Sequence, residues 1–224
     1  MKKIIHAVAF DMDGVIFDSE RIYKIAWQNA GWDYGYDISD DLYYHCTGLT
    51  IEACENLVVE KFGRDFPINE FAKNWRQRLR QLILAGEMKL KVGFDELFHF
   101  LEAKKIPLAI ATSSRRKEVA SNFANLNYLS HFASIVAAED VKNGKPHPEI
   151  YLQTAKNLLV DPAKMLVIED SINGIKAALA AGAVAVMVPD LVPPDEFVKN
   201  QAFAVVANLS SIIQLPIEFV KGLS

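Results

Sequence analysis

The chain has 224 residues, of which 51% are hydrophobic and 23% are charged, and its formal net charge is -4. So much apolar material excludes a disordered chain, and the length allows one large domain or a core with a smaller companion. The 28 acidic residues outnumber the 24 basic ones, which argues against a general nucleic-acid or membrane-surface binder, and no apolar run reaches the ~18–20 residues of a membrane span. We therefore expect a soluble cytoplasmic protein that binds neither nucleic acid nor membrane.

Short apolar runs recur along the chain, and each of them ends in polar residues. These predicted strands are residues 4–10, 107–111, 134–137, 165–168, 183–188 and 203–206. Amphipathic stretches with helical spacing lie between the later runs, at residues 116–126, 148–159 and 172–181. Continuous apolar strands that alternate with helices predict an α/β fold, with an open, mostly parallel, Rossmann-like sheet and helices on both faces.

One interval between the first two predicted strands is too long for a simple crossover. Almost a hundred residues separate them, whereas a crossover needs little more than a dozen residues beyond its helix. This interval has helical spacing at residues 20–30, 39–45, 50–62 and 69–85. We therefore predict a core domain formed by residues 1–17 and 89–224 and an inserted helical cap domain at residues 18–88. A helix at residues 94–104 then returns the chain to the sheet.

Two carboxylates follow the first predicted strand directly. Residues i and i+2 of a strand point the same way, so Asp11 and Asp13 are expected on one side of its carboxyl end, where open parallel sheets bind ligands. Adjacent carboxylates repel unless a cation or a shared proton relieves them, and an oxygen-seeking ion such as Mg²⁺ would do so. An acidic turn closed by Gly14 is the alternative interpretation.

A second acidic pair, Glu169 and Asp170, follows the strand predicted at residues 165–168. Asp170 or Ser171 could simply cap the next helix. However, two strands of one sheet that deliver up to four negative charges to one edge would be strongly unfavourable without a metal ion. The two pairs together predict a magnesium site.

Positive charge and hydroxyl groups are expected near the same edge. Lys145 stands in a loop fixed by turn residues and prolines, and its ammonium suits a phosphate or a carboxylate, although most lysines are solvated surface residues. Thr112, Ser113 and Ser114 follow the strand predicted at residues 107–111. Hydroxyls and free backbone N–H groups at the start of a helix could bind phosphate, and simple N-capping is the alternative.

These residues occur in the order of a known set of motifs. The sequence resembles the haloacid dehalogenase superfamily in four places, which are Asp11-Met12-Asp13-Gly14, Thr112, Lys145 and Glu169-Asp170. The flanking residues resemble its β-phosphoglucomutase and sugar-phosphatase branch. The segments concerned are Phe17-Asp18-Ser19-Glu20, Gly144-Lys145-Pro146-x-Pro148-Glu149-x-Tyr151 and Glu169-Asp170-Ser171-x-x-Gly174. The resemblance covers essentially the whole chain, including a helical cap between the first and second motifs.

The resemblance implies a chemical role for each acidic residue of the motifs. Asp11 would be the nucleophile that forms an aspartyl-phosphate intermediate. Asp13 would protonate the departing alcohol and then take a proton from the attacking water. Mg²⁺ would be held by the Asp11 carboxylate, the Asp13 backbone carbonyl and Asp170, with Glu169 as a further ligand or a holder of water.

The resemblance also implies how the phosphoryl group is bound. Thr112 and Lys145 would contact the transferred group, with Ser113 and Ser114 near it. Phosphoryl transfer depends mostly on positioning and charge stabilisation, so these residues would suffice. We expect a Mg²⁺-dependent phosphatase that acts as a monomer on a small phosphorylated metabolite, in particular a sugar phosphate.

The predicted cap offers several candidate substrate contacts. They are Tyr23, the turn that contains Thr47 and Gly48, and the pair Arg76 and Arg80. The two arginines lie four residues apart and so share one helical face, which is also typical of a solvated basic surface.

Two other functions stay open from the sequence. The mutase branch carries a histidine in the first cap helix, where this sequence has Tyr23, and this difference favours simple hydrolysis over a phosphosugar mutase. The other alternative is an inactive metal-binding α/β module, against which the presence of all the motif residues argues.

Overall fold

The chain divides into two compact units in the computed structural model, which describes residues 2–46 and 51–222. One unit comprises Met1–Phe17 together with Leu90–Ser224, and the other comprises Asp18–Lys89. The first unit is therefore built from two separate segments of the chain. The second unit is a single continuous insertion.

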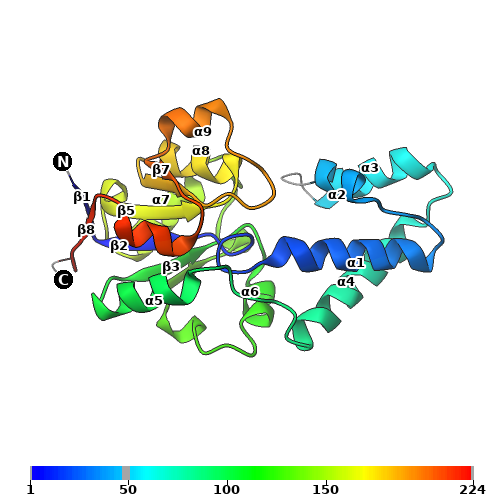
Figure 1. Ribbon diagram of the computed structural model, residues 1–224, viewed down its shortest axis with the longest axis horizontal. Helices are drawn as coiled ribbons and strands as arrows, with labels where there is room; N and C mark the ends of the chain where they lie inside the picture. The colour runs from blue at the N-terminus through cyan, green and yellow to red at the C-terminus, as the bar shows by residue number, and fades with distance from the viewer. Residues whose placement is uncertain (1, 47–50, 223–224) are drawn as a thin grey trace. The chain divides into compact units, whose positions relative to one another are not determined.

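The first unit contains a six-stranded parallel sheet with the strand order β4-β3-β2-β5-β6-β7 (Figure 1). The strands are β2 (Ala7–Phe10), β3 (Leu108–Ala111), β4 (Ser134–Val136), β5 (Met165–Glu169), β6 (Val184–Met187) and β7 (Ala204–Val205). The chain proceeds outward from β2 in one direction and then outward from β5 in the other. The junction of β2 and β5 is therefore the topological switch point, where sheets of this type bind ligands. The predicted α/β fold with a mostly parallel sheet is confirmed.

Helices cover both faces of this sheet (Figure 1). The helices of this unit are α5 (Phe94–Ala103), α6 (Arg116–Asn122), α7 (Glu149–Asn157), α8 (Ile172–Ala180) and α9 (Glu196–Gln201). The strand β2 shows how the alternating side chains divide between the faces. Ala7 and Ala9 belong to the apolar cluster that includes residues of α7 and α8. The ring of Phe10 instead packs against that of Phe94 in α5, with 5.8 Å between the ring centroids. All four residues of β2 are buried, as its unbroken apolar pattern predicts.

The prediction of a single strand at residues 4–10 is wrong. The chain bends at His6, and β1 (Lys3–Ile5) pairs with β8 (Ile217–Phe219) in a separate two-stranded parallel sheet. Lys3 and Ile4 are exposed, in contrast to the fully buried β2. An apolar run therefore continues across a boundary between two sheets, which its composition does not reveal.

Two helical predictions in this unit also need correction. The helix predicted at residues 116–126 ends earlier, because α6 stops at Asn122. The short helix α9 was not predicted at all. Its signal is Asp195 after two prolines, since the Asp195 carboxylate accepts a hydrogen bond from the amide of Val198 at 2.8 Å and so caps the helix.

The second unit is helical, in the parts that the structure describes. Its helices are α1 (Ser19–Asp33), α2 (Asp40–Cys46), α3 (Ile51–Phe62) and α4 (Ile68–Leu84). Aromatic rings form its core: Trp27 contacts Phe71 at 5.3 Å and Trp75 at 5.5 Å between ring centroids. These helices agree with the four predicted ranges to within a few residues.

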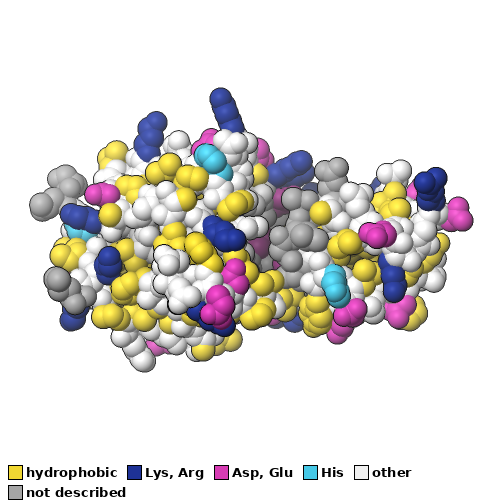
Figure 2. All heavy atoms as spheres, turned by 90° about the horizontal axis from the view of Figure 1, so that it is seen from above, with side chains coloured by type: hydrophobic (Ala, Val, Ile, Leu, Met, Phe, Trp, Pro, Cys, Tyr) yellow, Lys and Arg dark blue, Asp and Glu magenta, His cyan; other side chains and the backbone are white. Residues whose placement is uncertain are grey.

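The surface carries charges of both signs. On the face shown in Figure 2, the Lys and Arg side chains are interspersed with Asp and Glu. Some of the surface charges of the protein form ion pairs, such as Arg116 with Asp140 at 2.6 Å. Among the helices of residues 2–46 and 51–222, none has both the length and the apolar character needed to cross a membrane.

Candidate active site

The site begins where β2 ends, at the switch point of the sheet. Asp11 follows Phe10 directly, and its amide donates to the carbonyl of Ile168 in the neighbouring strand β5 at 3.0 Å. This bond fixes the Asp11 backbone to the strand that leads into Glu169 and Asp170. Asp11 is only 7% exposed, so its carboxylate lies in a buried position at the carboxyl edge of the sheet.

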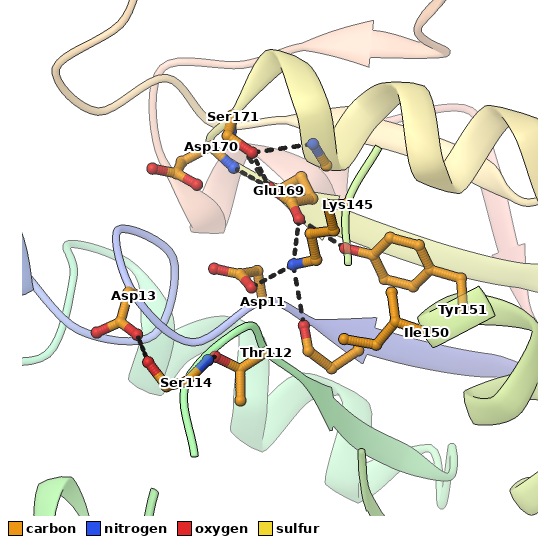
Figure 3. Close-up of polar contacts among 12 residues, drawn as sticks. Asp11, Asp13, Thr112, Ser114, Lys145, Ile150, Tyr151, Glu169, Asp170 and Ser171 are labelled. Atoms are coloured by element: carbon orange, nitrogen blue, oxygen red, sulfur yellow. Dashed lines mark hydrogen bonds and ion pairs between the residues drawn. The ribbon is translucent and has the colours of Figure 1, made fainter. Parts of the chain in front are cut away.

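Lys145 lies at the centre of the site (Figure 3). Its Nζ is 2.5 Å from Asp11 Oδ1 and 2.6 Å from Glu169 Oε1, and it donates to the Ala111 carbonyl at 3.1 Å. These three partners use the three donors of the ammonium group. Lys145 therefore joins the ends of β2, β3 and β5, and it is held by its partners rather than solvated.

Glu169 is the most constrained carboxylate of the site. Its Oε1 also accepts a hydrogen bond from the Tyr151 hydroxyl at 2.6 Å. Its Oε2 accepts from the amide of Ser171 at 3.2 Å and from the Ser171 hydroxyl at 2.9 Å. A Cβ at Gly174 would lie 1.8 Å from Glu169 Cδ, so glycine is needed there for helix α8 to approach. Both oxygens of Glu169 are occupied, which favours a positioning role over direct metal binding.

Tyr151 belongs to the motif that resembles the family, but the sequence analysis predicted no role for it in the site. It stands on α7 and is fully buried, and the Lys145 ammonium lies 5.3 Å from the centre of its ring. Its sequence signal was its place in the motif, six residues after Lys145.

The buried carboxyl groups differ in their affinity for protons. Burial raises the pKa of Asp11 to about 7, although the Lys145 charge acts in the opposite direction. Burial followed by the charges of Glu169 and Asp11 holds the pKa of Asp170 well above its ordinary value. Burial alone would raise the pKa of Glu169 as well, but the Lys145 charge and the hydrogen bonds from Lys145 and Tyr151 lower it. The contacts of Glu169 with Lys145 and Tyr151 thus favour its ionised form, whereas burial favours the protonated forms of Asp11 and Asp170, whose protons a cation could replace.

The acidic residues fit a divalent cation. One carboxylate oxygen from each of Asp11, Glu169 and Asp170 lies within 4.8 Å of the others. A Cβ at Gly14, whose φ is +77°, would lie 2.2 Å from Asp170 Oδ2, so this glycine provides both the turn and the space for Asp170. A donor set made only of oxygens suits Mg²⁺.

Asp13 lies beside this group with a different partner. Its Oδ2 accepts a hydrogen bond from the Ser114 hydroxyl at 2.6 Å (Figure 3). Thr112 is buried, and its hydroxyl oxygen accepts from the Ser114 amide at 3.0 Å. Ser113 is exposed. The structure therefore brings Asp13, Thr112 and Ser114 together next to Asp11.

Three backbone amides around the start of α6, which were expected to be free for phosphate, already have partners. The Ser114 amide already donates to Thr112, the Arg115 amide donates to Glu118 at 2.8 Å, and the Arg116 amide donates to Glu139 at 3.1 Å. Side chains of the protein thus satisfy these donors before any phosphate could. The hydroxyl groups and Lys145 are thus stronger phosphate-binding candidates than these three amides.

The candidate substrate contacts of the helical unit have local partners. The ring of Tyr23 lies 6.1 Å from that of Trp75, and the Arg76 guanidinium lies 4.5 Å from the Trp75 ring and pairs with Glu55 at 3.0 Å. Arg80 is exposed. Thr47 and Gly48 lie outside the described residues.

Buried charges at the switch point of a parallel sheet define an α/β enzyme, because such groups belong to ligand sites and not to a packed core. The sequence of residues 8–188 matches the family of haloacid dehalogenase-like hydrolases, and the chain belongs to this family. The resemblance that the motifs indicated is therefore confirmed.

Several of the proteins to which the chain is similar are named as phosphatases. The chain is 34% identical over 176 residues to a phosphorylated carbohydrates phosphatase of Thermotoga maritima, covering 79% of this chain and 81% of the relative. It is 29% identical over 178 residues to a fructose-1-phosphate phosphatase of Escherichia coli, and the match covers 79% of this chain and 93% of that protein. A crystal structure from Thermotoga maritima, provisionally assigned as a β-phosphoglucomutase, matches with a TM-score of 0.81 and 30% identity. This match covers 94% of this chain and 98% of the other. The protein is an enzyme, a hydrolase of the phosphatase type.

Proposed function

We propose that this protein is a Mg²⁺-dependent phosphatase that hydrolyses a small phosphorylated sugar through an aspartyl-phosphate intermediate. The observation that carries the proposal is the buried Lys145, held 2.5 Å from Asp11 and 2.6 Å from Glu169. A cation fixed against a nucleophilic carboxylate is suited to the negative charge of a transferring phosphoryl group. The similarity to two phosphatases of phosphorylated carbohydrates supports the substrate class.

In the first step, an oxygen of Asp11 attacks the phosphorus atom. The bond from phosphorus to the sugar oxygen breaks as the bond to Asp11 forms, and Asp13 gives a proton to the departing alcohol. The Ser114 hydroxyl, 2.6 Å from Asp13 Oδ2, orients that carboxyl group. Lys145 balances the charge of the phosphoryl oxygens and keeps Asp11 in place.

In the second step, a water molecule replaces Asp11 on the phosphorus. Asp13, now ionised, takes a proton from this water, the bond from phosphorus to Asp11 breaks, and inorganic phosphate leaves. The same carboxyl group therefore acts as acid and then as base, and it ends the cycle protonated. No residue other than Asp11 becomes covalently modified.

Asp11 and Asp170, at the carboxyl edge of the sheet, would hold the metal ion. Glu169 would keep Lys145 and Ser171 in place beside it. Bound Mg²⁺ would supply positive charge for the phosphoryl oxygens and ionise the Asp11 carboxyl group. We assign the phosphate contacts to Thr112 and Lys145. We assign substrate selection to the helical insertion, residues 18–88, acting as the cap of the catalytic core.

A panel of phosphate esters tests this proposal. Hexose, pentose, glycerol and nucleoside monophosphates are offered with Mg²⁺ or with a chelator, and both phosphate release and isomerisation are scored. We expect Mg²⁺-dependent phosphate release, with the highest kcat/KM for a sugar phosphate. Isomerisation without phosphate release would establish a mutase, and turnover that survives the chelator would contradict the metal-dependent mechanism.

A further inference from the structure

A further carboxylate lies at the edge of the sheet that carries the acidic site. Asp190 follows β6, the strand next to β5, and the two strands run parallel with Glu169 opposite Met187. The amide of Val188 donates to the Glu169 carbonyl at 2.8 Å. The segment that leads into Asp190 is therefore hydrogen-bonded to the residue that immediately precedes Asp170.

Asp190 is nearly buried, and only one of its oxygens has a partner. Its side chain is 10% exposed, and its Oδ1 accepts a hydrogen bond from Lys91 Nζ at 2.7 Å. Its Oδ2 is buried and has no hydrogen-bond donor among the described residues. A buried carboxylate oxygen without a donor is costly, so such an atom is usually bonded to water or to a ligand.

The position of Asp190 relates this oxygen to the metal site. Glu169 lies opposite Met187 in the parallel strands β5 and β6, and the Val188 amide is bonded to the Glu169 carbonyl. Asp170 comes directly after Glu169 and Asp190 two residues after Val188, so the two carboxylates follow neighbouring strands at the same carboxyl edge of the sheet. Lys91 neutralises Asp190 on one side and holds it in place, which leaves the other side for a group that can donate a hydrogen bond.

We propose that Asp190 is an outer carboxylate of the metal site, accepting through Oδ2 a hydrogen bond from the water of a Mg²⁺ ion held by Asp11 and Asp170. Mg²⁺ is released from its water reluctantly and usually keeps several water molecules in protein sites. Outer groups that receive hydrogen bonds from this water determine how tightly and in which orientation the ion is held. This inference rests on the proposed metal-dependent function and adds a positioning residue to it.

The alternative role for Asp190 is purely structural. In that case the Lys91–Asp190 pair would only fix the chain around Lys91, whose amide donates to the carbonyl of Ile16 at 2.9 Å. The two roles differ in what the pair does for Mg²⁺ binding. If the pair is purely structural, removing either partner should have the same effect on Mg²⁺ binding. If Asp190 belongs to the metal site, removing its carboxylate should weaken Mg²⁺ binding, whereas removing the positive charge of Lys91 should not.

The test is calorimetric titration of the metal-free protein with MgCl₂ at pH 8, which measures binding without turnover. We expect Asp190→Asn to weaken Mg²⁺ binding about 10–100-fold, the usual effect of losing an outer group of a metal site. Lys91→Met removes a competing positive charge, so its Mg²⁺ affinity should be unchanged or higher. Glu196→Gln removes an equal charge from the exposed Lys199–Glu196 pair and should bind as the wild type does.

The double variant Lys91→Met with Asp190→Asn covers the case in which Asp190→Asn leaves Lys91 buried and unfolds the protein. It should bind Mg²⁺ as weakly as Asp190→Asn, because only the carboxylate matters. Wild-type affinity in the variants without Asp190, or an equal loss in Lys91→Met, would overturn the inference alone. A wild-type protein that binds no Mg²⁺ would overturn the proposed metal-dependent function as well.

Discussion

The two units of the protein place their charged groups differently. In the sheet unit, the side chains of Asp11, Lys145 and Glu169 are 10%, 8% and 0% exposed, and they pair with one another. In the helical unit, the ion pairs lie at the surface, as for Arg76 with Glu55, where the arginine side chain is 49% exposed. Burying charges costs several kcal/mol per ion even when they are paired, so buried networks are expected where they serve chemistry.

The hydrophobic cores of the two units differ as well. The sheet unit packs aliphatic strands against helices, and its glycines at positions 14 and 174 make room for acidic side chains. The helical unit packs aromatic rings, with Trp75 2% exposed at the centre. Its stability therefore depends on apolar contacts. Its exposed polar residues can change from one substrate specificity to another without loss of the core. Catalysis can be inferred from the sheet unit, whereas the identity of the sugar cannot be inferred from the helical unit.

The largest effect should come from Asp11→Asn, which removes the nucleophile from the buried network. Turnover should fall on the order of 10⁴–10⁶-fold, as it does when a catalytic nucleophile is removed. Rapid-quench experiments with a labelled phosphate ester should find no label on the protein. A phosphorylated Asp11→Asn protein would show that another residue is the nucleophile.

Asp13→Asn should separate the two aspartates by their roles. We expect turnover to fall on the order of 10²–10⁴-fold, the usual contribution of a general acid–base group. Label should still be trapped on Asp11 when the ester has an activated leaving group such as nitrophenolate, because that group needs little protonation. Equal loss of labelling in both variants would contradict this division of roles.

Lys145→Met tests the cost of leaving the buried carboxylates unpaired. Asp11 and Glu169 would lose their common partner, and the free energy of unfolding should fall by about 3–5 kcal/mol in urea denaturation of the metal-free protein. Arg76→Met is the matched control in the helical unit, and its exposed pair should contribute about 1 kcal/mol or less. Similar losses in the two variants would remove the contrast between the units.

The pH dependence of Mg²⁺ binding should follow the carboxyl groups of the sheet unit. The pKa of Asp11 is raised to about 7, so this group keeps its proton below pH 7 and the cation must displace it. Binding should therefore weaken as the pH falls through 7, by about tenfold per pH unit for one displaced proton, and the raised pKa of Asp170 adds to this trend. Calorimetry in buffers of different ionisation enthalpy would count the released protons, and a Kd independent of pH from 6 to 8 would contradict the assignment.

Several features of this protein were decided by local sequence. Runs of apolar residues identify strands that are buried on both faces, because alternation disappears when neither face meets water. Carboxylates directly after such runs must lie at the carboxyl edge of a parallel sheet, so Asp11 and Asp170 could be placed from the sequence. Helical spacing located α1 to α4 and α8 in the same way, since this signal acts within a few residues.

Only the tertiary structure decided how the polar groups pair. Lys145 and Asp11 are 134 residues apart, and no local pattern indicates that the ammonium group contacts two carboxylates at once. The Tyr151 hydroxyl on Glu169 and the Lys91–Asp190 pair likewise depend on how distant strands and helices align. The break at His6 has the same cause, because β1 pairs with β8 near the far end of the chain. Burial patterns report whether a residue meets water, whereas the choice of its partner depends on the register between elements that the sequence places far apart.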